Sequence, residues 1–109
     1  MAITYKVLGQ ISPSAGTANT LYTAPSGTSA VTSTISVCNQ NASAAAYRIA
    51  VRPAGETLAN KHYIAFDATV PALDSISLTI GVTLAATDVV TVYANTTNIS
   101  FNLFGTEVT

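Results

Sequence analysis

Apolar and polar side chains alternate with a period of two in short runs along most of this sequence. At the start of the chain, Ile3, Tyr5 and Val7 alternate with Thr4 and Lys6. Successive residues of a strand point to opposite faces of a sheet, so this period indicates half-buried strands. The abundant Val, Ile and Thr favour the same conformation because they branch at Cβ. The alternation also places further side chains on shared faces: Val31/Ile35/Val37, Tyr47/Ile49/Val51, His62/Ile64/Phe66/Ala68, Ile76/Leu78/Ile80 and Ile99/Phe101/Leu103.

Turn-forming residues separate these runs at regular intervals. Pro25 and Gly27 lie between the second and third runs, and Pro53 and Gly55 follow the fourth. Proline presets and glycine permits the backbone angles that turns need. We therefore predict an all-β protein, a single antiparallel β-sandwich domain over residues 1–109 with either a jelly-roll or an immunoglobulin-like topology. Its eight or so strands should lie near residues 3–11, 18–24, 30–38, 46–52, 62–69, 75–83, 89–95 and 99–107, whereas residues 55–60 could form one helical turn or a loop.

Charge is scarce in this chain. Only 8 % of the residues are charged and 49 % are hydrophobic, whereas about 25 % are charged in an ordinary soluble domain. Four basic residues against five acidic ones do not favour binding to nucleic acid, and the high apolar content excludes disorder. The outward strand positions are expected to be mostly Thr, Ser and Ala, which are easily desolvated. We interpret such a surface as one that contacts other protein, including copies of itself, so a homo-oligomer is predicted.

The apolar content does not indicate a membrane span. Residues 7–47 carry no charge, but Ser, Thr, Asn, Gly and Pro interrupt the segment too often for the roughly 20 consecutive apolar residues of a spanning helix. The first residues also lack the pattern of a secretory signal, so synthesis in a cytoplasm is expected. The single cysteine, Cys38, cannot form an internal disulfide, which agrees with a reducing compartment.

The residues that could support catalysis are few and do not form a recognisable motif. The single histidine, His62, has no second histidine or matching cysteine for a metal site, and it is expected to be a surface or rim imidazole. The chain contains no G-x-S-x-G nucleophile motif. No calcium loop or phosphate-binding glycine loop is present either. We therefore predict a protein that is not an enzyme and that uses no cofactor or metal.

Most of the charge gathers in one segment. Arg48 and Arg52 share one strand face, about 13 Å apart, and Lys61 and His62 follow shortly after. These four residues form a possible protein-contact patch, since the planar guanidinium of arginine pairs well with carboxylates. The alternative is a solvated sheet face with its loop.

Several segments that combine a predicted strand with a turn resemble small virion proteins of tailed bacteriophages, including cyanophages. They are LYTAPSGTSA at residues 21–30, ISVCN at 35–39, YRIAVRP at 47–53, KHYI at 61–64, GVTLAATDVV at 81–90 and FNLFG at 101–105. The resemblance extends over nearly the whole chain but contains no catalytic motif. It implies a structural component of the particle, on the head surface or in the tail apparatus, and no catalytic residues.

The resemblance and the scarcity of charge lead to one hypothesis and one alternative. The hypothesis is a capsid decoration or cement protein that binds the head surface, with itself (a trimer is favoured) and the major capsid protein or tail proteins as partners. It would be made in the host cytoplasm and located in the virion. The alternative is a tail, neck or fibre module, including one that binds a host glycan. The lack of Trp and the presence of only five Tyr argue mildly against glycan binding.

Overall fold

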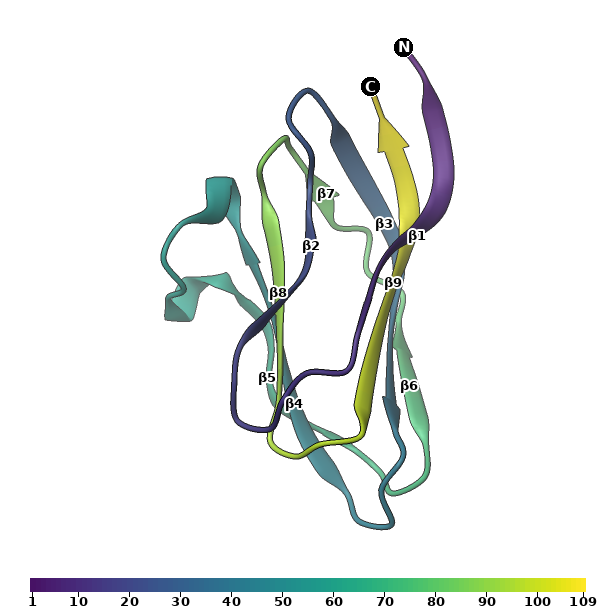
Figure 1. Ribbon diagram of the computed structural model, residues 1–109, viewed down its shortest axis with the longest axis vertical. Coiled ribbons are helices and arrows are strands. Elements are labelled where there is room, and N and C mark those ends of the chain that lie inside the picture. Colours follow the sequence, from purple (N-terminus) through teal and green to yellow (C-terminus); the bar gives the residue numbers. More distant parts are fainter.

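The computed structural model describes residues 1–109 and contains two antiparallel sheets that face each other (Figure 1). The predicted all-β sandwich is thus confirmed. Two short 3₁₀ turns, η1 (Pro53–Gly55) and η2 (Asn60–His62), flank the segment for which a helical turn or a loop was expected. The strands are β1 (Ile3–Ile11), β2 (Asn19–Thr23), β3 (Ser29–Asn39), β4 (Ala45–Arg52), β5 (Tyr63–Val70), β6 (Ser75–Leu78), β7 (Thr83–Leu84), β8 (Val89–Ala94) and β9 (Ile99–Val108).

One predicted strand, residues 75–83, is divided into β6 and β7. The side chain of Thr32 on the neighbouring strand β3 occupies the interruption. Its Oγ1 donates to the carbonyl oxygen of Ile80 at 3.1 Å and accepts from the amide of Val82 at 3.1 Å. A buried threonine therefore replaces ladder hydrogen bonds that a continuous strand would have made.

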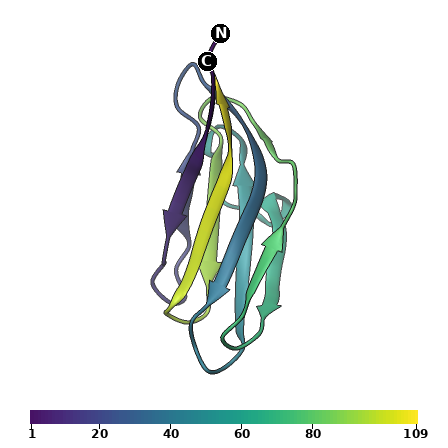
Figure 2. The ribbon, with the colours of Figure 1, turned by 90° about the vertical axis from the view of Figure 1, so that its right-hand side faces the viewer.

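The strand order decides between the two predicted topologies. One sheet has the order β1-β9-β3-β6, with β7 also paired to β3, and the other has the order β2-β8-β4-β5. Figure 2 shows the first sheet from its outer side, with β1 at one edge and β6 at the other. Along the chain, β1 to β4 alternate between the sheets, and β4–β5 is the one pair of consecutive strands that hydrogen-bond to each other. This is the double-Greek-key arrangement of a jelly roll. An immunoglobulin-like sandwich would instead pair its first two strands in one sheet.

The core lies between the two sheets. Its largest fully buried side chains include Phe101 and Ile99 of β9, Ile49 of β4 and Val37 of β3. Tyr47 meets the ring of Phe101 edge to face, with ring centroids 6.4 Å apart. The alternation predicted for β9 and for the Tyr47 and Ile49 positions of β4 is therefore confirmed. Complete burial of each such aliphatic or aromatic side chain contributes about 1.5–3 kcal/mol to folding.

Bulges change the phase of the alternation in several strands. In β3 the pairing with β9 shifts between Thr32 and Thr34, so Val31 points outward and is 46 % exposed while Ile35 points into the core. The expectation that Val31 shares a face with Ile35 and Val37 is therefore wrong. In β1 the pairing shifts between Val7 and Gly9, and Leu8 is buried. A bulge adds one residue to a strand, which reverses the side chains that follow it.

Candidate functional site

Arg48 of the predicted contact patch lies on the outer face of the sheet β2-β8-β4-β5. A bulge in β5 brings two side chains close to Arg48. Tyr47 pairs with Ala68 and Ile49 pairs with Ala65, so Phe66 and Asp67 both lie opposite Arg48. Asp67 has a φ of 50°, in the left-handed region, which asparagine and aspartate tolerate better than most residues do. A second register shift, between the pairs Ile49–Ala65 and Ala50–Tyr63, separates Phe66 from Ile64, which the alternation had placed on the same face.

The guanidinium group of Arg48 contacts three neighbouring side chains. Its Nε donates to Asp67 Oδ1 at 2.7 Å and its Nη2 donates to Asp67 Oδ2 at 3.3 Å. The same group lies 4.1 Å from the ring centroid of Phe66 and 4.3 Å from that of Tyr93. The hydrogen bond to Asp67 raises the pKa of Arg48 above its ordinary value. An arginine that is stacked on two rings and paired twice with a carboxylate holds its own strands together.

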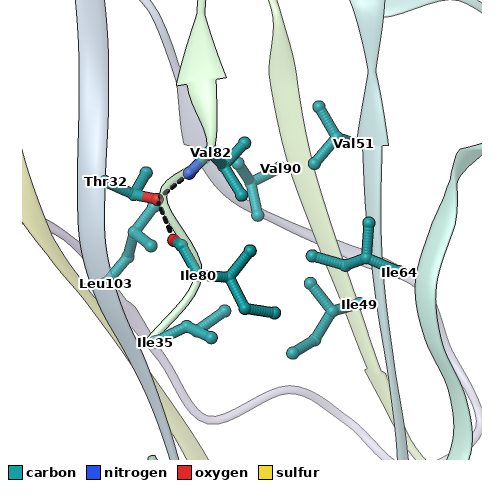
Figure 3. A pocket seen from close by; sticks show the side chains of 9 residues that line it. All are labelled: Thr32, Ile35, Ile49, Val51, Ile64, Ile80, Val82, Val90 and Leu103. Carbon is teal, nitrogen blue, oxygen red and sulfur yellow. Dashed lines mark hydrogen bonds between the residues drawn. The ribbon is translucent and has the colours of Figure 1, made fainter. Parts of the chain in front are cut away.

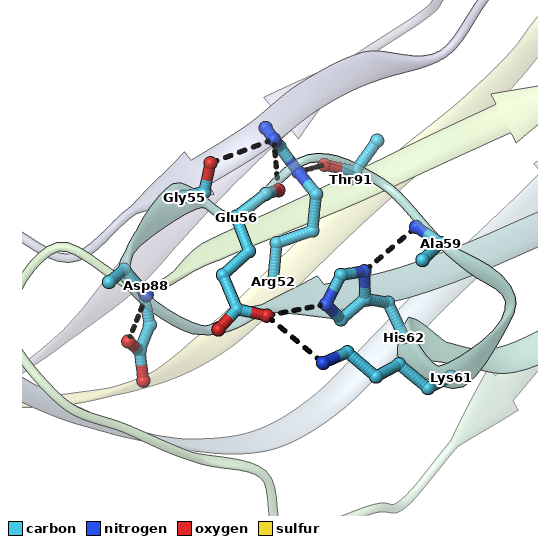
Figure 4. Close-up of polar contacts among 9 residues, drawn as sticks. Arg52, Gly55, Glu56, Ala59, Lys61, His62, Asp88 and Thr91 are labelled. Carbon is cyan, nitrogen blue, oxygen red and sulfur yellow. Dashed lines mark hydrogen bonds and ion pairs between the residues drawn. The ribbon is translucent and has the colours of Figure 1, made fainter.

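Arg52 stabilises the loop that follows β4 (Figure 4). Its Nε donates to Thr91 Oγ1 at 3.0 Å, and its Nη1 donates to the carbonyl oxygens of Gly55 at 3.3 Å and Glu56 at 2.9 Å. These bonds satisfy backbone carbonyls of a loop without a strand partner. The side chain therefore acts on its own chain.

His62 is buried, with 5 % of its surface exposed, and the expectation of a surface or rim imidazole is wrong. Its Nδ1 accepts from the amide of Ala59 at 3.0 Å, and its Nε2 lies 3.1 Å from Glu56 Oε1. An accepting Nδ1 assigns the proton of the neutral ring to Nε2, which donates to the carboxylate. The exposed Lys61 places its Nζ 3.5 Å from the same oxygen. The hydrogen bond from His62, followed by the charge of Lys61, lowers the pKa of Glu56.

The four predicted patch residues therefore form two groups. Arg52, Lys61 and His62 surround Glu56, as Figure 4 shows, whereas Arg48 is paired with Asp67. Glu56 joins the first group, although the sequence analysis did not select it. A carboxylate at a distance of six residues from a histidine, across a loop, has no periodic signal that would identify it.

The remaining charged side chains also have partners within the chain. Lys6 Nζ lies 3.2 Å from Glu107 Oε1, and Tyr22 donates to Glu107 Oε2 at 2.6 Å. The bond from Tyr22, together with Lys6, lowers the pKa of Glu107, while burial and Glu107 raise the pKa of Tyr22. Asp74 accepts from the amide of Ser75 at 2.8 Å, and Asp88 accepts from the amides of Ala54 and Ala85 at 2.9 Å each. The few charges of this protein are thus used to hold its own elements.

The outer face of the other sheet presents a second candidate surface, which the sequence analysis missed. Five of its outward side chains at the end near the chain termini are large and apolar: Ile3 (53 % exposed), Tyr5 (83 %), Val7 (47 %), Val31 (46 %) and Phe104 (36 %). They come from the three adjacent strands β1, β9 and β3, with Tyr5 and Val31 both opposite Thr106, and Val7 opposite Phe104. We call these five residues the apolar face. The expectation that outward positions are mostly Thr, Ser and Ala does not hold for this half of the sheet.

The other half of the same outer surface is polar. Gln10 of β1 pairs with Asn102 of β9, and Asn102 pairs with Ser36 of β3, which pairs with Ser77 of β6. The Gln10 side chain donates to Asn102 Oδ1 at 2.7 Å. Amide and hydroxyl side chains of this kind can hydrogen-bond to water. The side chains of the apolar face are almost entirely hydrocarbon and gain little from contact with water. Exposed apolar patches of this kind mark interaction sites.

The sandwich encloses no cavity of ligand size. A gap between the sheets is lined by eight hydrophobic residues and Thr32 (Figure 3). Ile80 and Ile64 approach it from opposite sides, and the space left is enough for about one water molecule. No group of three or more His, Cys, Asp or Glu side chains is positioned to hold a metal ion. The structure contains no helix long and apolar enough to cross a membrane.

These features define the protein as an all-β jelly roll with one unpartnered apolar face. No known protein-family model matches the chain, and no curated protein matches its sequence. Among solved structures, the chain is similar to one chain in the structure of infectious bursal disease virus, Gx strain. The TM-score is 0.51 over 97 % of this chain, with 9 % sequence identity, and this chain spans 32 % of the viral chain. At this identity the likeness concerns the fold, and it adds nothing specific to tailed bacteriophages.

Proposed function

We propose that this protein is a non-enzymatic structural component of a virus particle, and specifically a decoration or cement protein on the head of a tailed bacteriophage. It binds the head surface and stabilises it through contacts among symmetric copies. The observation that carries the proposal is the apolar face, because an exposed apolar sheet surface without charge is suited to burial against protein.

The size of the apolar face supports this function. If a fully exposed large side chain offers about 200 Å², its five residues expose roughly 500 Å² of largely apolar surface. The largest patch on a typical monomer is about 300–600 Å² and is often functional. A contact of this size is modest for one copy. Many equivalent copies on a particle would strengthen it through avidity.

The use of charge within the chain supports the same function. Each charged side chain already has an intramolecular partner, and none belongs to the apolar face, so burial of that face removes no charged group from water. The fold, which also occurs in the structure of a virus, is compatible with this role. The resemblance of the sequence to tailed-phage virion proteins is the reason for proposing a tailed bacteriophage as the particle.

Binding to virions tests the proposal directly. Virions lacking the protein are mixed with the recombinant chain and collected by sedimentation, and gold-labelled antibody locates the bound protein by electron microscopy. We expect label on the head. Val31→Lys should lose most of the binding, while Ser36→Lys, on the polar half of the same strand and face, should bind as the unmodified protein does. A chain that stays in the supernatant, or that is absent from native virions, contradicts the proposal.

A second candidate function, a tail or fibre module that binds a host glycan, is favoured by the rings around Arg48. Phe66 is 54 % exposed, and Tyr63 meets it edge to face with centroids 4.9 Å apart. Aromatic rings in exposed positions can stack on sugars. A glycan array with hits that Phe66→Ala abolishes would favour this function over head decoration, whereas an array without hits would argue against it.

A further inference from the structure

Strand β1 forms a free edge of the sheet that carries the apolar face. It pairs with β9 alone, and residues 3–7 are all exposed. Beyond the strand end, Ala2 and Thr109 exchange two backbone hydrogen bonds, of 3.1 and 2.9 Å. Bonded and non-bonded pairs alternate along an antiparallel ladder. The amide and carbonyl groups of Thr4 and Lys6 therefore face β9, and those of Ile3, Tyr5 and Val7 face the open edge.

This edge lacks the usual protection against pairing with another strand. Natural edge strands are guarded by charges, proline, bulges or a covering loop. Between Ile3 and Val7 the only charge is Lys6, whose ammonium group is held by Glu107 at 3.2 Å. The bulge in β1 comes after Val7, so five consecutive residues remain regular and available.

We propose that β1 pairs with β1 of a second copy of this chain, antiparallel, about a two-fold axis at Tyr5. In this register Tyr5 lies opposite Tyr5 of the second copy, and Ile3 lies opposite Val7 of the second copy. Each of these pairs exchanges two backbone hydrogen bonds. This is the symmetric register in which all three residues facing the open edge find partners.

The side chains fit this register on both faces of the sheet. On the outer face, Tyr5 meets its own copy, and aromatic cross-strand pairs are favourable. On the inner face, Lys6 lies opposite Thr4 of the second copy and not opposite Lys6. Beyond that Thr4, on β9 of the second copy, lies Glu107. Its Cα is about 10 Å from the Cα of Lys6, across two strand spacings. Each lysine is thus placed between two carboxylates, and this charge complementarity favours a second copy as the partner.

Pairing also changes the apolar face. The two faces join into one strip of roughly 1,000 Å² across six strands, and this strip is the surface that the proposed function places against the particle. The inference rests on that function for its biological use, although the pairing itself does not depend on it. An interface formed by one strand from each copy is smaller than the 1,200–2,000 Å² or so of a stable complex, so the pair is reversible in solution.

A disulfide cross-link tests the register. In a Cys38→Ala background, Tyr5→Cys would place two cysteines across the axis with Cα atoms about 5.5 Å apart, within the range that a disulfide bridges. We expect a covalent dimer after mild oxidation, seen by non-reducing electrophoresis. Val31→Cys lies two strands further from the axis in each copy, about 24 Å from its mate, and should stay monomeric. Leu73→Cys, at a distant residue that is 72 % exposed, controls for random collision and should also stay monomeric.

The outcomes separate the inference from the proposed function. A dimer formed equally by Leu73→Cys, a dimer formed by Val31→Cys, or no dimer from Tyr5→Cys overturns the β1 pairing. Light scattering on the chain with native Tyr5 should approach twice 11.2 kDa as concentration rises, and Tyr5→Lys should weaken association at least tenfold, because two lysines would face each other at the axis. A trimer, which the sequence analysis favoured, would also overturn the inference. Virion binding is measured separately, so a cross-linked dimer that does not bind virions contradicts the function alone.

Discussion

The predicted contact patch and the apolar face present opposite chemistry on opposite sides of the sandwich. In the patch, the polar side chains have partners within the chain: Arg48 pairs with Asp67, and Lys61 and His62 bond to Glu56. The apolar face has neither charge nor partner, and the strand at its edge has unpaired backbone groups. The comparison teaches that charge in this protein holds its own loops and bulges. The surface left for other molecules is the one from which charge is absent.

The largest loss of stability is expected at Gly105, on the strand in the middle of the apolar face. Gly105 lies between the bulges of β1 and β3, and a Cβ at this position would collide with the carbonyl of Val31 and the Cα of Thr32. Backbone cannot yield as a flexible side chain can, so Gly105→Ala should lower the free energy of unfolding by about 3 kcal/mol. Gly81→Ala is the matched control, since a Cβ there meets open space. Urea unfolding measures both, and equal midpoints would refute the expected collision.

A smaller loss of stability is expected at the Lys6–Glu107 ion pair, on the inner side of the sheet that carries the apolar face. Tyr22→Phe removes the 2.6 Å hydrogen bond to Glu107 and should cost about 1.5–2 kcal/mol, as expected for a hydrogen bond to a charged group. Arg48→Ala, in the patch, leaves this bond intact and serves as a comparison. If thermal unfolding of Tyr22→Phe matches that of the unmodified protein, the bond does not contribute to stability.

The same carboxylates predict the response to acid. The folded-state pKa of Glu107 and that of Glu56 lie below the ordinary value of 4.5. Their contribution to stability is therefore fully present above pH 4.5 and is lost as the pH falls through the lower folded-state pKa values. Glu107→Gln should flatten the fall in unfolding midpoint below pH 4.5. A fall of unchanged steepness would assign the acid sensitivity to other groups.

Association distinguishes the two halves of the outer sheet. Val31→Lys introduces charge into the apolar face at a site that is already 46 % exposed, so folding should be little affected. Binding to virions should weaken by roughly tenfold, which corresponds to about 1.4 kcal/mol, whereas self-association through β1, two strands away, should not change. Ser36→Lys should leave both unchanged. Sedimentation with virions measures the binding, and equal effects of the two lysines on it would contradict the special role of the apolar face.

The smallest effect on association is expected in the contact patch. Arg48→Ala with Arg52→Ala removes bonds that lie within the chain, so self-association should not change. Loss of the bonds from Arg52 to Gly55 and Glu56 should make the loop after β4 more sensitive to protease. Weaker association of the double variant, with a loop cut no faster than before, would restore the patch as a contact surface.

The sequence predicted the strands more closely than the surfaces. The predicted spans 3–11 and 46–52 agree with β1 and β4 to within one residue at each end, because turn residues and alternation are local signals. The division of residues 75–83 into β6 and β7 depends on Thr32, which is far away in the chain. The burial of His62 depends on Glu56 and the amide of Ala59 across a loop, and local patterns carry no information on such contacts.

Alternation, branching at Cβ and composition act residue by residue, so they are enough to predict an antiparallel sandwich with little charge. The jelly-roll order, the internal pairing of the charges and the outward direction of Ile3, Tyr5, Val7 and Val31 depend on contacts between distant segments. For the outward side chains, those contacts act through bulges. One extra residue in β1 and in β3 reverses every side chain beyond it, and where that residue is accommodated depends on Gly105 of the strand between them.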